Sequence, residues 1–262
     1  MAEGPEDPGF DAVVLAAGRG PGDPLARAHG VSHKCLLPVA GKPMLARVVE
    51  TLRDSGFRRI VVSIESRALI ETALGSAAAT VEHAPSRDTA AASAQAALAA
   101  APSFRRSLVT TGDHPLLTPD MLRHFLDAAV RSGADLNVGL APAETILDAY
   151  PEAKRTFLAF AGDRVSGCNL FALHNDRALA AIEHWRHVES NRKRPWRLVS
   201  SFGIVPLMAY FAGRLSLEAA FRAASRRLGI EIGPVLMPFA DAAVDVDKPE
   251  DLELAEKVLR SR

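Results

Sequence analysis

Residues 15–20 read LAAGRG, and the chain continues through KCLLPV at 34–39 to GKP at 41–43. The apolar run before the first glycine predicts a strand over Asp11–Ala17, which the following glycines end in a loop. Loops of small residues let backbone N–H groups approach phosphate oxygens, so an anion site is predicted here, although a tight turn has the same pattern. A dinucleotide-binding motif is disfavoured, because Asp23 stands where that motif needs its third glycine, and the Walker P-loop fails because no Gly-Lys-Ser/Thr follows.

Outward from this loop, short β-branched runs alternate with amphipathic helical patterns as far as residue 140. Further strands are expected at 59–64, 80–83, 107–111 and 135–140, and helices from 44 to a stop at Gly56, at 69–74, 90–101 and 119–131. This alternation predicts an α/β fold with a Rossmann-like, mostly parallel sheet flanked by helices on both faces.

The second half of the chain is less regular. Strands are expected at 156–161, 165–173, 230–239 and 243–246, and helices at 176–188, 217–228 and 249–260. Since neither a repeat nor a long linker is visible, we expect a flexible tail over residues 1–10 and a single domain over 11–262. A helical elaboration is expected at about 175–230.

The composition excludes several classes of protein. Of 262 residues, 48% are hydrophobic, so the chain is not intrinsically disordered. Lys plus Arg and Asp plus Glu are 31 each, which argues against bulk positive charge for holding nucleic acid or anionic lipid. The longest uncharged runs, 89–104 and 198–213, are shorter than a membrane span, and the acidic N-terminus is unlike a signal peptide. Since only two cysteines occur, we expect a protein of the reducing cytoplasm. From the charge balance and the short apolar runs we expect neither nucleic-acid partners nor transmembrane segments.

The compound pattern of glycine loop and lysine resembles the GT-A-type nucleotidyltransferases. This family includes the sugar-1-phosphate nucleotidyltransferases and the MobA-like enzymes that act on molybdopterin or cobinamide phosphate. The matching positions are Leu15, Ala16, Gly18, Gly20, Lys34, Leu36, Val39, Gly41, Lys42 and Pro43. One departure is that Pro21-Gly22 stands where many relatives carry Thr-Arg, so Arg19 or Arg27 would have to supply that cation.

The resemblance implies a reaction of an NTP, with CTP or GTP favoured, and a phosphorylated small molecule, which releases pyrophosphate. Lys34 would hold the phosphates and act in catalysis together with Asp113. The nucleotide would lie against the loop formed by Leu15, Ala16, Ala17, Gly18, Arg19 and Gly20.

Nucleotidyl transfer needs positive charge on the phosphates, and Mg²⁺ prefers carboxylate and phosphate oxygens. Asp113 follows an expected strand in GDHP, where α/β sheets place ligands, although it could also be a turn residue. Near the other end, in VDVDKPEDL, Asp245 and Asp247 are two apart and would share one face of a strand. We predict Asp113 and Asp247 as metal ligands with Asp245 beside them. The alternative for Asp247 is the N-cap of the last helix.

The remaining substrate contacts are predicted more loosely. Thr89 and Ser93 share a helical face where relatives contact the base, although capping residues would look the same. Asn169 could hydrogen-bond the acceptor. Arg194 and Arg197, in the most basic stretch of the chain, could bind its phosphate or form a solvated loop.

Three hypotheses about the function remain. The preferred one is Mg²⁺-dependent nucleotidyl transfer to a sugar phosphate, a polyol or lipid-headgroup phosphate, or a cofactor precursor. The first alternative is a GT-A glycosyltransferase that consumes a sugar nucleotide, with residues 245–247 as its Asp-x-Asp motif. The second is a catalytically inactive nucleotide-binding regulator. The segment 200–228 could cap the acceptor site, form a homodimer contact or lie against lipid.

Overall fold

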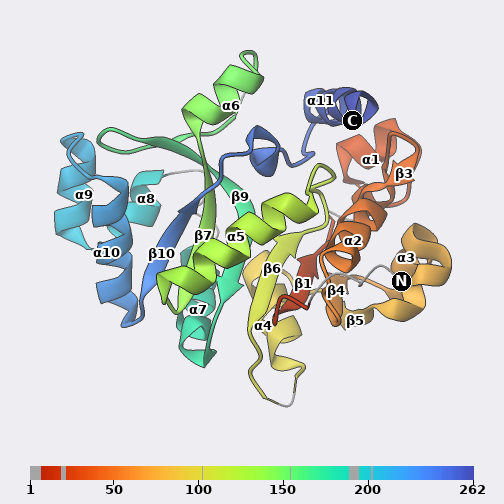
Figure 1. Ribbon diagram of the computed structural model, residues 1–262, viewed down its shortest axis with the longest axis horizontal. Coiled ribbons are helices and arrows are strands. Elements are labelled where there is room, and N and C mark those ends of the chain that lie inside the picture. The colour runs from red at the N-terminus through yellow and green to blue at the C-terminus, as the bar shows by residue number, and fades with distance from the viewer. Residues whose placement is uncertain (1–6, 19–21, 102, 154, 189–194, 202) are drawn as a thin grey trace. The chain divides into compact units, whose positions relative to one another are not determined.

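The structure is a computed structural model that describes residues 7–18, 22–101, 103–153, 155–188, 195–201 and 203–262. The chain divides into two compact units (Figure 1). The first contains the residues up to Arg123 together with Val244–Arg262, and the second contains His124–Ala243. Whether the two act as the single domain predicted over 11–262 stays a prediction.

The first unit is built on four parallel strands in the order β6-β1-β4-β5. Their bounds are β1 Asp11–Leu15, β4 Ile60–Ile64, β5 Glu82–Pro85 and β6 Ser107–Thr111. Apart from Asp11 and Ser63, strands β1 and β4 consist of apolar residues, and both strands are almost wholly buried, as expected of parallel strands covered on both faces. A two-stranded antiparallel ribbon, β2 Pro38–Val39 with β3 Lys42–Pro43, lies between β1 and β4 in the sequence.

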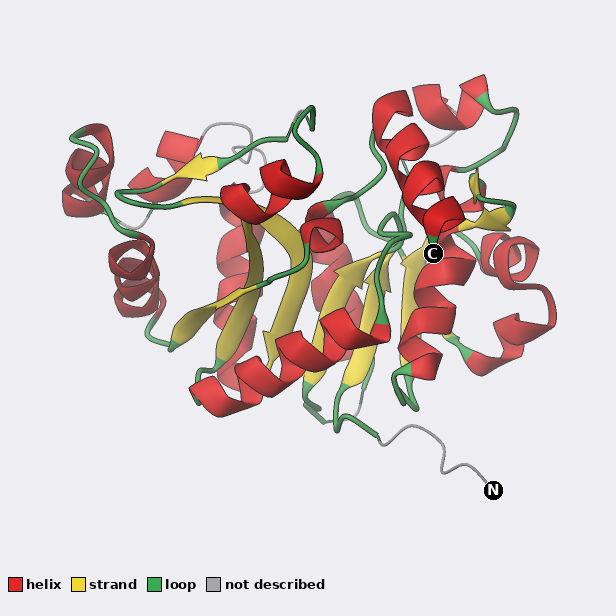
Figure 2. Cartoon of the chain, turned by 45° about the horizontal axis from the view of Figure 1, so that its top comes forward, coloured by secondary structure: helices red, strands yellow, loops and turns green. Residues whose placement is uncertain are grey.

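Helices flank these strands (Figures 1 and 2). Their bounds are α1 Pro24–Ala28, α2 Met44–Asp54, α3 Arg67–Leu74, α4 Ala90–Ala99 and α11 Pro249–Ser261. Helix α2 buries one stripe, formed by Met44, Leu45, Val48, Val49 and Leu52, which is the spacing expected of an amphipathic helix. Helix α5, Pro119–Ser132, begins in the first unit and continues into the second.

The second unit has a mixed sheet in the order β10-β7-β9, with β8 paired to β9. Strand β10 is parallel to β7, whereas β9 is antiparallel to both β7 and β8. The strands are β7 Leu136–Pro142, β8 Leu158–Ala159, β9 Arg164–Leu173 and β10 Ile232–Leu236. The helices are α6 Ala143–Ala149, α7 Leu179–Val188, α8 Pro195–Ser200, α9 Ile204–Phe211 and α10 Leu217–Leu228.

The predicted fold class is confirmed, because the strands are mostly parallel and helices flank them. Among the described residues, no helix is long and apolar enough to cross a membrane.

Several element predictions are wrong in detail. The strand expected at 156–161 pairs only at Leu158–Ala159, and the one expected at 230–239 is confined to Ile232–Leu236. The strand predicted at 243–246 is absent, since Ala240–Ala243 is a 3₁₀-helix and the following residues have no regular structure. Helix α1 was not expected; it forms because the Asp23 carboxylate accepts hydrogen bonds from the N–H groups of Leu25 and Ala26.

Candidate active site

Three neighbouring strands of the first unit end level with one another. Leu15, the last residue of β1, is paired with Ser63 of β4 and with Thr111, the last residue of β6. The loops that leave these strands carry Gly18, Glu65 and Asp113. The carboxyl ends of parallel strands are where open α/β sheets bind ligands, so this edge is the candidate site.

Two carboxylates that are far apart in the sequence meet at one ammonium group. The Nζ atom of Lys34 lies 2.8 Å from Oδ2 of Asp113 and 2.6 Å from Oδ1 of Asp247. The backbone fixes this meeting, because Val246 N–H donates to the Asp113 carbonyl at 2.9 Å and so holds the C-terminal segment beside the β6 loop. The structure thus brings together Lys34, predicted to hold the phosphates, and the two predicted metal ligands, while these roles stay predictions.

The charge of Lys34 depends on this pair of carboxylates. Its side chain is only 14% exposed, and burial by itself would lower its pKa. Asp113 and Asp247 outweigh burial and hold the pKa above the ordinary lysine value. Lys34 is therefore a buried, permanent cation at neutral pH.

The carboxylates fit a divalent cation that is shared with a substrate. Asp113 Oδ1 is buried and has no hydrogen-bond partner within the described part of the chain, which leaves one carboxylate oxygen available as a ligand. In the same residues, no group of three or more His, Cys, Asp or Glu side chains is arranged to hold a metal. Two carboxylates without a full protein cage suit Mg²⁺, which takes its other ligands from phosphates and water.

Packing explains the glycines at this edge. A Cβ atom on Gly112 would lie 2.9 Å from Cβ and 3.3 Å from Cα of Ala16, which is tighter than van der Waals contact allows. A Cβ atom on Gly18 would lie 2.6 Å from Nε2 of His33. These two glycines let the β1 and β6 loops approach each other and the His33 ring.

Two residues of this edge were missed in the sequence. The buried ring of His33 accepts a hydrogen bond from Cys35 N–H at its Nδ1, and its Nε2 lies 3.1 Å from Oε2 of Glu65. The other oxygen of Glu65 accepts from Gly18 N–H at 2.9 Å, so His33 and Glu65 hold the glycine loop. Only their positions, directly before Lys34 and just after β4, could have indicated them.

This arrangement is not a nucleophilic centre. The Cys35 thiol lies 2.9 Å from His33 Nδ1, but burial, with the nearby Glu65 carboxylate, raises its pKa to about 12. A thiol with that pKa is not ionised at neutral pH, so Cys35 is a structural residue.

A protein-family model described as the MobA-like NTP transferase domain matches residues 12–194, which is more than half of the chain. The chain belongs to this family. Membership identifies this MobA-like protein as a nucleotidyltransferase and agrees with the resemblance predicted from the glycine loop and Lys34.

Individual relatives support the same family. The chain is 32% identical over 142 residues to the bifunctional protein GlmU of Bacillus cereus (strain AH187), a match that covers 54% of this chain and 28% of that protein. It is 31% identical to a hypothetical transferase from Thermus thermophilus, with a TM-score of 0.76 over 93% of this chain and 99% of the other.

A more distant structure shows the fold alone. The 4-diphosphocytidyl-2C-methyl-D-erythritol synthase of Anaerococcus prevotii is 14% identical, with a TM-score of 0.56 over 97% of this chain and 100% of its own.

Asp247 is not the N-cap of the last helix, which was the alternative to its role as a metal ligand. The N-cap of α11 is Lys248, and the capping carboxylate belongs to Asp251, whose Oδ2 accepts from the N–H groups of Asp247 and Lys248 at 3.1 and 3.2 Å. The Asp247 side chain reaches Lys34 instead. Asp245 is half-buried, and its role as a metal ligand stays a prediction.

The residues predicted to contact the nucleotide have structural partners of their own. Thr89 is the N-cap of α4 and accepts from Ala92 N–H, and Ser93 Oγ accepts from Arg87 N–H at 2.8 Å. Ala16 N–H donates to a carbonyl of β4, so with Gly18 two of the loop's donors are already bonded. Nucleotide contacts at these positions stay predictions, and Arg19 and Gly20 lie outside the described residues.

The predicted acceptor residue Asn169 has an unusual backbone. Its φ is 52°, a left-handed conformation that is uncommon for a residue other than glycine. It lies where the β7–β9 register shifts, and such bulges redirect side chains, often beside functional sites. Acceptor binding by Asn169 stays a prediction. Arg194 lies outside the described residues, as does the side chain of Arg197 in α8.

Proposed function

We propose that this nucleotidyltransferase moves a nucleoside monophosphate from an NTP, with CTP or GTP favoured, to a phosphorylated small molecule, with Mg²⁺ as its cofactor. The observation that carries the proposal is the Lys34 ammonium between Asp113 and Asp247, at 2.8 and 2.6 Å. One cation and two carboxylates at the carboxyl edge of the sheet are what a site needs to hold a metal ion and a triphosphate together.

In this reaction an oxygen of the acceptor phosphate attacks the α-phosphorus of the NTP. The bond from that phosphorus to the bridging oxygen breaks, and its electron pair leaves with pyrophosphate. The attacking oxygen is already anionic, so the step needs no general base. Catalysis then depends on in-line positioning and on neutralising the charge that develops on the leaving group.

The residues divide this work between them. Asp113, through the Oδ1 that no described residue hydrogen-bonds, and Asp247 would hold Mg²⁺, which when bound supplies positive charge to the phosphate oxygens. Lys34 would turn from the carboxylates to the phosphates as the nucleotide enters. His33 and Glu65 would position the glycine loop through Gly18.

The test is pyrophosphate release from each of the four NTPs in the presence of a panel of acceptors. The panel contains sugar phosphates, polyol and lipid-headgroup phosphates, and cofactor-precursor phosphates. We expect release to require Mg²⁺, to stop with a chelator and to be lost in Asp113→Asn. Turnover unchanged in Asp113→Asn would overturn the metal assignment.

The same assay separates the alternatives. A glycosyltransferase would release a nucleoside diphosphate from a sugar nucleotide and no pyrophosphate from any NTP. An inactive regulator would bind an NTP, seen as a thermal shift, without releasing pyrophosphate with any acceptor.

A further inference from the structure

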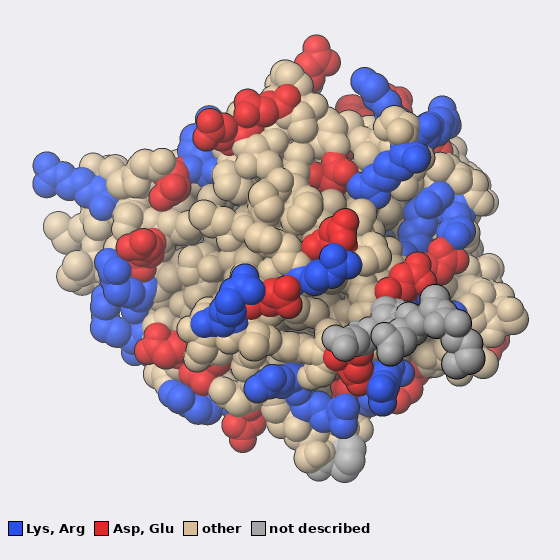
Figure 3. Space-filling view, in the orientation of Figure 1, with Lys and Arg blue, Asp and Glu red and all other residues tan. Residues whose placement is uncertain are grey.

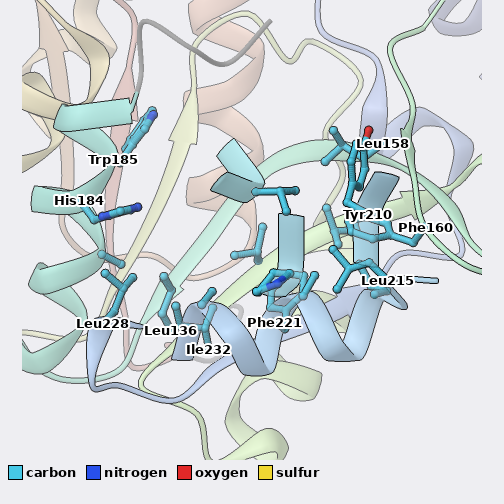
Figure 4. A pocket seen from close by; sticks show the side chains of 18 of the residues that line it. Leu136, Leu158, Phe160, His184, Trp185, Tyr210, Leu215, Phe221, Leu228 and Ile232 are labelled. Atoms are coloured by element: carbon cyan, nitrogen blue, oxygen red, sulfur yellow. The ribbon is translucent and has the colours of Figure 1, made fainter. Parts of the chain in front are cut away.

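The second unit contains a cavity of about 290 Å³ that the transfer reaction does not explain (Figure 4). Strands β7 and β10 form one wall through Leu136 and Ile232, and helices α7, α9 and α10 contribute Trp185, Tyr210 and Phe221. None of the described residues that line it is an Asp, Glu, Lys or Arg. Walls of this composition suit an apolar ligand better than a polar one.

Helix α9 is apolar on both of its faces. Pro206 and Tyr210 line the cavity. The side chains that the helix presents to solvent are Ile204, Val205, Met208 and Phe211, which are 66–74% exposed. They make up four of the seven large exposed hydrophobic side chains in the described part of the chain. A helix that is apolar all round normally lies in an apolar environment, so the outer face of α9 indicates a contact with one.

The sequence around this helix is strongly basic. In the described part of residues 179–228, five exposed Arg side chains (186, 214, 222, 226 and 227) stand against two exposed Glu side chains (183 and 218), although the whole chain is balanced at 31 against 31. On the side of the molecule where α9 and α10 lie, Figure 3 shows uncharged surface next to Lys and Arg side chains, with acidic groups among them. Apolar surface beside excess positive charge complements an amphiphile with a hydrocarbon chain and an anionic headgroup. The overall neutrality that argued against a lipid partner conceals this local excess.

We propose that the cavity binds one hydrocarbon chain of an anionic membrane lipid, and that α9 is the element that meets the lipid. The cavity is about twice the size of the ~150 Å³ cavity that accepts benzene, so it has room for roughly a dozen carbon atoms. The proposal is independent of the transfer reaction, because it rests on the second unit alone.

The chain carries its own reporters for this site. Its two tryptophans are Trp185, which lines the cavity, and Trp196 of α8, which is 41% exposed. Tryptophan emission is therefore measured while the full-length protein is titrated with dodecyl phosphate below its micelle concentration. Parallel titrations use inorganic phosphate and chain-brominated vesicles of phosphatidylglycerol or phosphatidylcholine.

We expect saturable changes in tryptophan emission with dodecyl phosphate and none with inorganic phosphate, since the hydrocarbon chain and not the headgroup fills the cavity. Brominated phosphatidylglycerol should quench the emission at lipid concentrations about tenfold below those needed with phosphatidylcholine. No saturable change with either amphiphile would overturn the proposal.

Two variants separate the cavity from the outer face of α9. Ala224→Phe places a ring in the cavity and should weaken dodecyl phosphate binding by about tenfold or more. Met208→Glu should abolish vesicle binding and leave dodecyl phosphate binding intact. Val130→Glu, at a 50% exposed hydrophobic residue of α5, is the matched control and should bind vesicles as the wild type does. If Ala224→Phe does not fold, Ala220→Leu makes the same test.

Unaltered dodecyl phosphate binding in a folded cavity variant would refute the cavity as its site. Sedimentation velocity tests the other occupant of the α9 face. If Met208→Glu turns a dimer into a monomer and leaves vesicle binding unchanged, a second copy of the chain covers this face and the lipid proposal fails.

Discussion

Replacing Lys34 by methionine should tighten the binding of a divalent cation to the nucleotide-free protein while it removes catalysis. The Lys34 ammonium lies 2.8 and 2.6 Å from the two carboxylate oxygens that a metal ion would use. An ion bound between Asp113 and Asp247 must therefore displace the ammonium or bind beside a like charge. Methionine keeps most of the length of the side chain and removes only that competitor.

The size of the effect follows from Coulomb's law. Two unit charges about 4 Å apart interact by about 1 kcal/mol at the dielectric constant of water, and a divalent ion doubles this to about 2 kcal/mol. At about 1.4 kcal/mol per tenfold, the variant should bind the ion roughly 30-fold more tightly. Burial of Lys34 would increase the effect, whereas rotation of the lysine away from the carboxylates would reduce it, so a gain of about 10- to 30-fold is expected.

The assay is a calorimetric titration with Mn²⁺ in place of Mg²⁺, without nucleotide. Lys42→Met is the matched control, because Lys42 is paired with Glu50 on the surface of the same unit and its loss changes the net charge equally. The double variant of Lys34→Met with Asp113→Asn should lose the gain. Pyrophosphate release by Lys34→Met should fall by about 10²- to 10³-fold, the usual cost of removing a charge-stabilising group. Equal Mn²⁺ affinity in Lys34→Met, Lys42→Met and the wild type would refute the shared-ligand geometry.

Three further predictions concern stability. Gly112→Ala should lower the free energy of unfolding by about 1–3 kcal/mol, because the new Cβ would press on Ala16 in the β1 loop. Gly22→Ala, whose Cβ would lie within 4 Å of no described atom outside the adjacent residues, should change it by less than about 0.5 kcal/mol in urea titrations. Burial raises the pKa of the Asp135 carboxyl, but its hydrogen bonds outweigh burial and hold the pKa below the ordinary value. The ionised carboxylate therefore stabilises the fold above a pH of about 3.9, and this stabilisation is lost as the pH falls through the pKa of the folded state. Asp135→Asn should therefore cost about 1–3 kcal/mol at neutral pH and progressively less in acid, and a constant difference at all pH values would contradict this. Asp251→Ala should cost about 1 kcal/mol through the lost α11 cap and also slow pyrophosphate release, with the exposed Glu250→Ala as a control that does neither.

The sequence predicted the parts of the site that depend on local chemistry. These parts are short sequence patterns: the strand and glycine loop at 11–20, Lys34 and the GDHP turn. The expected chemistry requires their residue types whatever the rest of the fold is. The resemblance to the MobA-like family followed from these patterns, and the fold class followed from the alternation of strand and helix patterns; both are confirmed. Local patterns could not reveal His33 and Glu65, because a histidine and a glutamate have many surface and core roles and only their contact distinguishes these two.

The segment 243–246 shows how a correct pattern produced a wrong element. Val244 and Val246 are buried while Asp245 is half-buried and Asp247 exposed, so the two-residue alternation is real. Alternation of buried and exposed side chains indicates an extended backbone with one buried side, and such a backbone need not be paired in a sheet. Here a described backbone hydrogen bond runs from Val246 to Asp113 in the β6 loop rather than into a sheet ladder.

By itself the sequence determined which chemical groups the protein carries: a glycine loop, a lysine and acidic residues, for which binding of phosphates and Mg²⁺ stays a prediction. Only the tertiary structure decided which of these groups meet. Lys34 is 79 residues from Asp113 and 213 from Asp247, and strand register and one backbone hydrogen bond bring them within reach of one another. The same holds for residues 200–228, which by sequence alone could cap the acceptor site, form a dimer contact, lie against lipid or belong to the core. In the structure one face of α9 is exposed and the other lines a cavity, because burial depends on what packs against a helix and not on its composition.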